Sequence, residues 1–196
     1  MAKKSTTTIR EKAVRAALAL AAEKGWLETG MADIAKKAKI PLHELHDHFA
    51  DRFDILAAYG RIVDKKVMET IGEPDPSLSP RDRLFDILME RFDVLNEDRD
   101  GVIAIVKSFC CDPKQAVISL PHLCRSMGWM LETAGIETGG YKGILKIMGM
   151  NAVYLKTLKT WANDDSPDMA KTMAALDKNL GYAEKLAGTM GMTDDV

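Results

Sequence analysis

The stretch "DIAKKAKIPLHELHDHFADRFDIL", Asp33 to Leu56, decides the fold of this chain. It reads as two short helices joined by a tight turn at "KIP" and followed by a third, longer helix. A supporting helix, a turn short enough to cross two helices steeply and a second helix with an exposed face are the parts of a helix-turn-helix motif. The stretch therefore predicts a DNA-reading head, although three helical pieces within about 50 residues also occur in small bundles.

The second helix of this motif is acidic where a DNA reader is expected to be basic. Glu44 and Asp47 lie on it and Asp51 follows it, and a phosphate backbone repels all three charges. Asp51 stands directly before an apolar helical pattern over residues 52–70, so we expect it to cap that helix.

The remainder of the chain also has helical periodicity, with no alternating strand pattern. We expect helices over residues 9–24, 31–38, 42–49, 52–70, 81–96, 101–109 and 141–161, one opened by Asp112-Pro113 and kinked at Pro121, and one opened by Ser166-Pro167-Asp168. Ser79 and Asp82 have capping-box spacing at the start of the helix over 81–96. The fold class is therefore all-α, with about nine helices.

The proline-rich stretch "GEPDPSLSP" predicts the boundary between two domains. Residues 1–71 would form the head with its connecting helix, and residues 72–196 a helical body. The head holds 13 Lys and Arg against 10 Asp and Glu, while the body holds 14 against 19. The basic end is thus the candidate partner of a polyanion.

Composition and motifs exclude several classes of protein. The three cysteines, Cys110, Cys111 and Cys124, are odd in number and lack a His at metal spacing, so we expect buried reduced thiols, as in a cytoplasmic protein. No apolar run reaches the roughly 18 to 20 residues of a membrane span, and no signal peptide is recognisable. The sequence shows no nucleophile-base pair, paired acids or phosphate loop, so we expect neither an enzyme nor a cofactor or metal.

The order of residues between Ile9 and Val63 resembles the head of the TetR family of transcriptional repressors. The matching positions are Gly25, Ile34-Ala35, Ala38, Ile40, Leu45, His48, Phe49 and Ile55-Leu56. The resemblance implies a TetR-like fold, in which a three-helix head with the helix-turn-helix precedes a C-terminal body for ligand binding and dimerisation. It also implies a homodimeric, ligand-responsive regulator, a repressor, whose partners are a double-stranded DNA operator and a small apolar ligand or lipid.

The head departs from the TetR pattern at positions that contact phosphate in that family. Gly30 stands for a Thr, Pro41 for a Ser, Glu44 for a Thr or Ser and His46 for a Tyr. The DNA-binding residues that we predict are Lys36, Lys37, Lys39, His43, Glu44, His46 and Arg52. A solvated helix face is an equally good reading of the lysines. A zinc site at His43, His46 and His48 is disfavoured, because no fourth ligand has matching spacing.

The segment "DDSPDMAKTMAALDKNL" carries a second resemblance, to the lipid-binding family of ubiquinone biosynthesis. The matching residues are Asp164 or Asp165, Ser166, Pro167, Asp168, Thr172, Leu176 and Asp177. That family has a TetR-like fold whose head no longer binds DNA, so the alternative function is a lipid-binding or isoprenoid-binding protein of quinone biosynthesis. Helix capping alone also explains "SPD".

Two sets of body residues are candidates for sites. The predicted ligand-binding residues, chosen from an interior rich in Met and aromatic side chains, are Phe92, Phe109, Met127, Met130 and Met148. The predicted dimerisation residues step along the last helix at coiled-coil spacing and are Met169, Met173, Leu176 and Leu180. The same stripe would also serve to close the core of one subunit.

Overall fold

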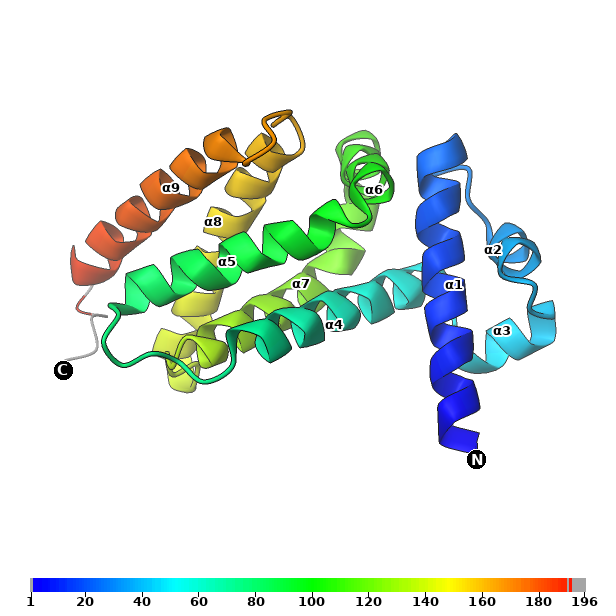
Figure 1. Cartoon of the computed structure of the whole chain (residues 1–196), viewed down its shortest axis with the longest axis horizontal. Helices are drawn as coiled ribbons and strands as arrows, with labels where there is room; N and C mark the ends of the chain where they lie inside the picture. The colour runs from blue at the N-terminus through cyan, green and yellow to red at the C-terminus, as the bar shows by residue number, and fades with distance from the viewer. Residues whose placement is uncertain (1, 190, 192–196) are drawn as a thin grey trace. The chain divides into compact units, whose positions relative to one another are not determined.

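The computed structural model describes residues 2–189 and 191, and over these residues it contains nine helices and no strand (Figure 1). In chain order the helices are α1 (Ala2–Lys24), α2 (Met31–Ala38), α3 (Leu42–His48), α4 (Arg52–Ile71), α5 (Pro80–Asn96), α6 (Arg99–Cys111), α7 (Pro113–Thr133), α8 (Gly140–Trp161) and α9 (Ala170–Thr189). The all-α prediction is confirmed. No described helix is long and apolar enough to cross a membrane.

Helices α5, α6 and α8 begin one or two residues before the predicted positions, and two others differ from the prediction by more than two residues. Helix α1 begins at Ala2 rather than Ile9, because the polar residues before Ile9 lack apolar periodicity but contain no Pro or Gly that would break a helix. Helix α9 begins at Ala170, since the preceding residues from Ser166 form a turn that caps it.

The helices group into two compact units, one made of residues 1–63 and 95–122 and the other of residues 64–94 and 123–196. This division differs from the predicted boundary at residue 71, because α6 belongs with the head. Helix α6 packs on α1 at Gly101, where an added Cβ would lie 2.6 Å from the carbonyl oxygen of Leu18. The proline-rich loop lies inside the second unit, so prolines mark a loop here without marking a boundary between units.

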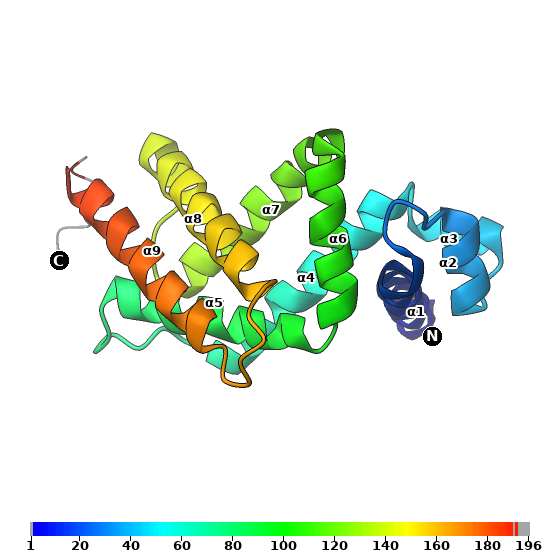
Figure 2. The same ribbon diagram turned by 90° about the horizontal axis from the view of Figure 1, so that it is seen from above.

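The first unit has its core where α2 and α3 pack against α1. Trp26, Ile34 and Leu45 are almost fully buried there, each at most 1% exposed. Figure 2, which looks nearly along α1, shows α2 and α3 on the same side of that helix. Apolar burial on this scale fixes the angle between α2 and α3, because each of these side chains loses all of its contact with water.

The second unit has an aromatic core and a tightly packed pair of helices, α8 and α9 (Figures 1 and 2). The ring of Phe92 stacks on the rings of Tyr154 and Trp161, with centroids 5.6 Å and 6.1 Å away. Between α8 and α9, Asn179 donates a hydrogen bond to the buried hydroxyl of Thr157. This contact favours one register of the two helices, since a slip would take the buried amide of Asn179 away from its partner.

The buried carboxylate of Asp164 holds the start of α9. It accepts hydrogen bonds from the backbone N–H and the hydroxyl of Thr172, both at 2.7 Å, and from the backbone N–H of Ser166 at 3.1 Å. Burial alone would raise the pKa of Asp164, but the hydrogen bonds from Ser166 and Thr172 outweigh it and hold the pKa well below its usual range. The "D-x-S-P-D" pattern thus has a structural role in this chain.

Candidate functional site

The turn between α2 and α3 is built on a left-handed residue. Lys39 has φ 56°, and the N–H of Ile40 donates to the carbonyl oxygen of Ala35 at 3.0 Å. This is the usual way to end a helix in a tight turn, although Gly more often occupies the left-handed position. Ile40 is then buried, and Pro41 starts α3 without a side-chain capping hydrogen bond. The predicted helix-turn-helix is present with the expected short turn.

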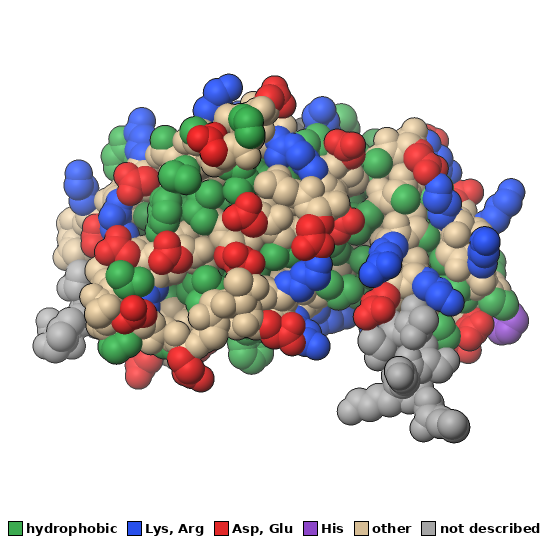
Figure 3. Space-filling view, viewed as in Figure 1, with side chains coloured by type: hydrophobic (Ala, Val, Ile, Leu, Met, Phe, Trp, Pro, Cys, Tyr) green, Lys and Arg blue, Asp and Glu red, His purple; other side chains and the backbone are tan. Residues whose placement is uncertain are grey.

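The outer side of this motif gathers most of the predicted DNA-binding residues. The exposed side chains are those of Lys36, Lys37, Lys39, His43 and His46, while Glu44 is half-buried. Lys37 forms an ion pair with Glu23 of α1. Figure 3 shows several Lys and Arg side chains and a His over the head. The surface therefore has a cationic part on α2 and the turn, and a mixed part on α3.

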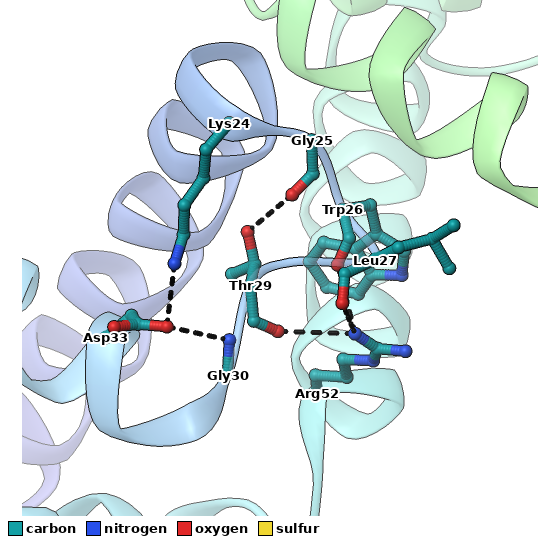
Figure 4. A network of polar contacts seen from close by, with 8 residues as sticks. All are labelled: Lys24, Gly25, Trp26, Leu27, Thr29, Gly30, Asp33 and Arg52. Carbon is teal, nitrogen blue, oxygen red and sulfur yellow. Dashed lines mark hydrogen bonds and ion pairs between the residues drawn. The ribbon is translucent and has the colours of Figure 1, made fainter.

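Arg52 differs from these residues, because its guanidinium contacts the turn between α1 and α2 (Figure 4). The Nη1 atom donates to the carbonyl oxygens of Trp26 at 3.0 Å, Leu27 at 3.2 Å and Thr29 at 3.3 Å. The guanidinium carbon also lies 5.5 Å from the Trp26 ring and 5.4 Å from the Phe53 ring, within cation-π range. Its role as a phosphate contact stays a prediction, whereas its role as a clamp is observed.

The same turn is held by a second set of polar contacts that position the start of α2 (Figure 4). The hydroxyl of Thr29 donates to the carbonyl oxygen of Gly25 at 2.8 Å. Asp33 accepts from Lys24 Nζ at 2.8 Å and from the backbone N–H of Gly30 at 3.1 Å. The hydrogen bonds from Lys24 and from Gly30 lower the pKa of Asp33. Asp33 thus satisfies the backbone N–H of Gly30, the residue before α2.

Two of the acids near the motif have a capping role. Asp51 accepts hydrogen bonds from the backbone N–H groups of Phe53 at 2.8 Å and Asp54 at 2.9 Å, so it caps α4 as predicted. Asp54 accepts in turn from the N–H of Ala50 at 3.0 Å, which ties the residue before the cap to the first turn of α4. The acids on α3 are not explained in this way, and Asp47 is exposed.

The head matches a known family over most of the residues that form these contacts. Residues 13–59 fit the family described as bacterial regulatory proteins, tetR family. The head is similar to this family over these residues, which include all of α2 and α3, the α1–α2 turn and Arg52.

Solved structures of TetR regulators have the same fold over nearly the whole chain. A TetR transcriptional regulator from Nitrosomonas europaea is 20% identical, with a TM-score of 0.68 over 90% of this chain and 98% of that chain. One from Rhodococcus sp. RHA1 is 16% identical, with a TM-score of 0.67 over 91% of this chain and 97% of that chain. The predicted TetR-like fold, with its helix-turn-helix head and helical body, is confirmed. No curated protein matches the sequence significantly.

The predicted ligand-binding residues do not lie in one place. Phe92, Met127 and Met130 are fully buried in the second unit, but Phe109 is half-buried on α6 in the first unit and Met148 is 61% exposed on α8. Helical periodicity shows that apolar residues share one side of a helix, but it does not show what that side packs against.

None of these five residues lines either of two cavities in the described part of the chain. A small apolar cavity of about 10 Å³ lies beside Trp26 and Ile105 in the first unit. An open depression of about 410 Å³ lies beside Phe85 and Met173 in the second unit.

The predicted dimerisation stripe is divided between two faces of α9. Met169, Leu176 and Leu180 are at most 7% exposed within one chain, and α9 packs on α8, whereas Met173 is 43% exposed. The reading in which the stripe closes the core of one subunit accounts for the three buried residues. The apolar side chains exposed on α8 and α9 include Ile144, Met148, Leu155, Tyr182 and Leu186.

The cysteine prediction was partly wrong. Cys111 is exposed and Cys124 is half-buried, because Cys111 ends α6 at the surface. The side chain of Cys110 lies outside the described part of the structure. Within the described residues, no group of three or more His, Cys, Asp and Glu side chains has the geometry to hold a metal ion.

Proposed function

We propose that the chain is a ligand-responsive transcriptional regulator, a repressor, in which α2 and α3 of the TetR head bind operator DNA. The observation that carries the proposal is the exposed cationic surface of Lys36, Lys39, His43 and His46 on a helix-turn-helix with a tight turn. Lysines at such positions release counterions from phosphates on binding. Imidazoles on the second helix can reach base edges in the major groove.

The contacts of the head support a division of roles among its basic residues. Lys36 and Lys39 act on phosphates, and Lys37 acts only when it exchanges Glu23 for a phosphate. Arg52 positions the α1–α2 turn through three backbone carbonyl groups. His43 lies one turn before the half-buried His48 and is the residue assigned to base edges.

A second copy of the chain is the partner that we assign to the outer face of α8 and α9. The apolar side chains on that face are Ile144, Met148, Leu155, Tyr182 and Leu186, and each is at least 46% exposed. Two heads are needed to read two half-sites about 34 Å apart along DNA, which gives a two-fold dimer a function. This assignment replaces Leu176 and Leu180, which are already buried, as dimerisation residues.

DNA binding is tested by fluorescence anisotropy with the DNA upstream of the chain's own gene and with random DNA. We expect the upstream DNA to bind at least about a thousandfold tighter than random DNA. The variant Lys36→Ala should weaken both, while the control Lys171→Ala, an exposed lysine on α9, should weaken neither. Equal affinity of all three proteins for both DNAs at low salt would contradict the proposal.

The alternative, a lipid-binding protein of quinone biosynthesis that keeps the head as a scaffold, is favoured by one observation. Helix α3 carries Glu44 and Asp47 and begins at Pro41, which supplies no side-chain donor to phosphate. The alternative predicts an isoprenoid that co-purifies with the chain, detected by mass spectrometry of an organic extract. An empty body together with specific DNA binding would remove it.

A further inference from the structure

The core of the second unit contains a buried ion pair. Arg91 on α5 and Asp64 on α4 are 4% and 6% exposed, and Nη1 of Arg91 donates to Oδ1 of Asp64 at 2.5 Å. The hydroxyl of Ser126 on α7 donates to the same oxygen at 2.6 Å. A buried ion pair stabilises a protein little more than apolar residues of the same size would. Stability alone therefore does not explain why this pair lies in the core.

Two polar atoms in this core have no hydrogen-bond partner. They are Nε of Arg91, which is a donor, and Oδ1 of Asn151, which is an acceptor. Both residues are at least nine-tenths buried. Native interiors leave few polar atoms unpaired, because such atoms have given up water without gaining a replacement. The core therefore has an unused donor on a cation and an unused acceptor on an amide.

Tyr154 is a neighbour of both residues that carry the unpaired atoms. The guanidinium carbon of Arg91 lies 5.3 Å from the centre of the Tyr154 ring. Asn151 lies three residues before Tyr154 on α8, so the two side chains share one face of that helix. Both unpaired atoms thus belong to side chains that border Tyr154.

The surroundings are apolar and adaptable. Phe92 stacks on Tyr154, and Met130 lies with its sulfur 3.9 Å from Nη1 of Arg91. Met127 is also fully buried in this unit. Methionine side chains are unbranched and flexible. Two of them in one core can therefore change rotamer to make room for an aromatic ring at a low cost in free energy.

We propose that Arg91 and Asn151 bind an apolar carboxylic acid of aromatic size in the core of the second unit. The ligand carboxylate would accept from Nε of Arg91, while Asp64 keeps Nη1, and a hydroxyl on the far end of the ligand would donate to Oδ1 of Asn151. Arginine is suited to this because its planar guanidinium pairs with carboxylates through several N–H groups. The inference rests on the proposed function and names the class of ligand for the body.

The charge of Arg91 is fixed, which sets the selectivity of the site. Burial alone would lower the pKa of Arg91, but Tyr154 and Asp64 outweigh it and raise the pKa. An alcohol of the same shape would satisfy the guanidinium less well than a carboxylate. A cation of the same shape has no lone pair with which to accept from Nε.

The test uses three probes with one carbon skeleton: phenylpropanoate, phenylpropanol and hydroxyphenylpropanoate. Isothermal titration calorimetry with the whole chain should give about tenfold tighter binding of phenylpropanoate than of phenylpropanol, the size of one charge-assisted hydrogen bond. Arg91→Met should remove this difference. Asn151→Leu should remove the additional affinity of the hydroxyphenyl compound and keep the preference for the acid. The control Arg81→Met, which loses a surface pair with Asp177, should bind as the wild type does.

A second variant keeps the test decisive if Arg91→Met fails to fold. Asp64→Asn retains Arg91 and removes the negative charge that would repel a ligand carboxylate, so it should bind phenylpropanoate more tightly than the wild type. Equal binding of acid and alcohol, absence of binding by all three probes, or unchanged binding in Asp64→Asn would each overturn the inference. Calorimetry involves no DNA, so a chain that binds DNA but no carboxylate overturns this inference alone. Carboxylate binding without DNA binding overturns only the proposed regulator.

Discussion

The Nη1 atom of Arg52, the first residue of α4, lies 3.0 Å from the carbonyl oxygen of Trp26, the residue after the glycine that ends α1. One side chain thereby ties the start of one helix to the turn before another. Two further carbonyl groups and the indole ring of Trp26 complete the clamp. Arg52, which the sequence predicted as a DNA-binding residue, thus holds the turn before α2 against the start of α4.

Arg52→Lys tests the clamp. A lysine keeps the charge, but its single ammonium group cannot stack on Trp26 while reaching three carbonyl oxygens. We expect the free energy of unfolding to fall by about 1–2 kcal/mol in a urea titration. The control Arg61→Lys, an exposed arginine on the same helix, should change it by less than about 0.5 kcal/mol. Unchanged stability with weakened DNA binding would assign Arg52 to phosphate instead.

Gly101→Val tests the crossing of α6 and α1. The first side-chain carbon would lie 2.6 Å from the carbonyl oxygen of Leu18, so a helix must shift. We expect a loss of about 1–3 kcal/mol in the free energy of unfolding. Gly60→Ala is the matched control, because an added Cβ on that helical glycine meets nothing within 4 Å. It should stabilise α4 by about 0.5–1 kcal/mol, and a similar effect of both variants would refute the close crossing.

Asp164→Asn tests the cap of α9. The amide presents an NH₂ group to donors from Thr172 and Ser166, so we expect a loss of about 1–3 kcal/mol at neutral pH. Because the folded state lowers the pKa of Asp164, its carboxylate contributes fully above the ordinary pKa of about 4. The contribution decreases as the pH falls below that value and is lost only as the pH falls through the lowered pKa of the folded state. Thermal unfolding at pH 7 and pH 3 should show the two proteins converging in acid, and a pH-independent difference would count against the cap.

The helices were predictable from the sequence, because apolar periodicity and capping residues act over a few neighbouring positions. Residues 31–38 were predicted as a helix and form α2, and Asp51 caps α4 as expected. The role of Arg52 was not predictable in the same way, since its partners lie in a turn distant in the chain. Gly25-Trp26 followed by an arginine at the start of α4 is the signal that could have indicated a clamp.

The predicted dimerisation stripe shows a second limit of sequence reasoning. Met169, Met173, Leu176 and Leu180 have the spacing of a helix seam, but spacing does not state whether the seam faces another chain. In the structure α8 already covers Leu176 and Leu180. The apolar stripe that remains exposed on α8 was visible in the sequence as Ile144, Met148 and Leu155, but which stripe faces inward depends on tertiary packing.

Lys36→Ala tests the phosphate contacts of α2. Loss of one contact should reduce the slope of the logarithm of affinity against the logarithm of salt concentration by about 0.9, for cognate and random DNA alike. Glu23→Gln should act in the opposite direction, because it frees Lys37 from its ion pair. We expect that variant to bind both DNAs more tightly at low salt. A steeper slope in Lys36→Ala, or weaker binding by Glu23→Gln, would be incompatible with these roles.

Glu44→Thr tests the acidic residue on α3. Glu44 is half-buried in the first turn of α3, beside His43 and after a Pro41 that supplies no side-chain donor. A threonine there removes a negative charge near phosphate and adds a hydroxyl donor. We expect random DNA to bind more tightly by roughly 1–2 kcal/mol, measured by anisotropy at two salt concentrations. Asp47→Thr, on the same helix but fully exposed, is the control for charge alone.

The cognate site distinguishes two ways in which Glu44 can face DNA. If Glu44 only repels phosphate, cognate and random DNA gain the same free energy in Glu44→Thr, and the specificity ratio stays constant. If its carboxylate accepts the amino group of a cytosine, the cognate site loses about 1–3 kcal/mol while random DNA still gains. Unchanged affinity for both DNAs would mean that Glu44 does not face DNA. The acidic α3 would then belong to a scaffold, as the lipid-binding alternative requires, and the exposed lysines of α2 would be a solvated helix face.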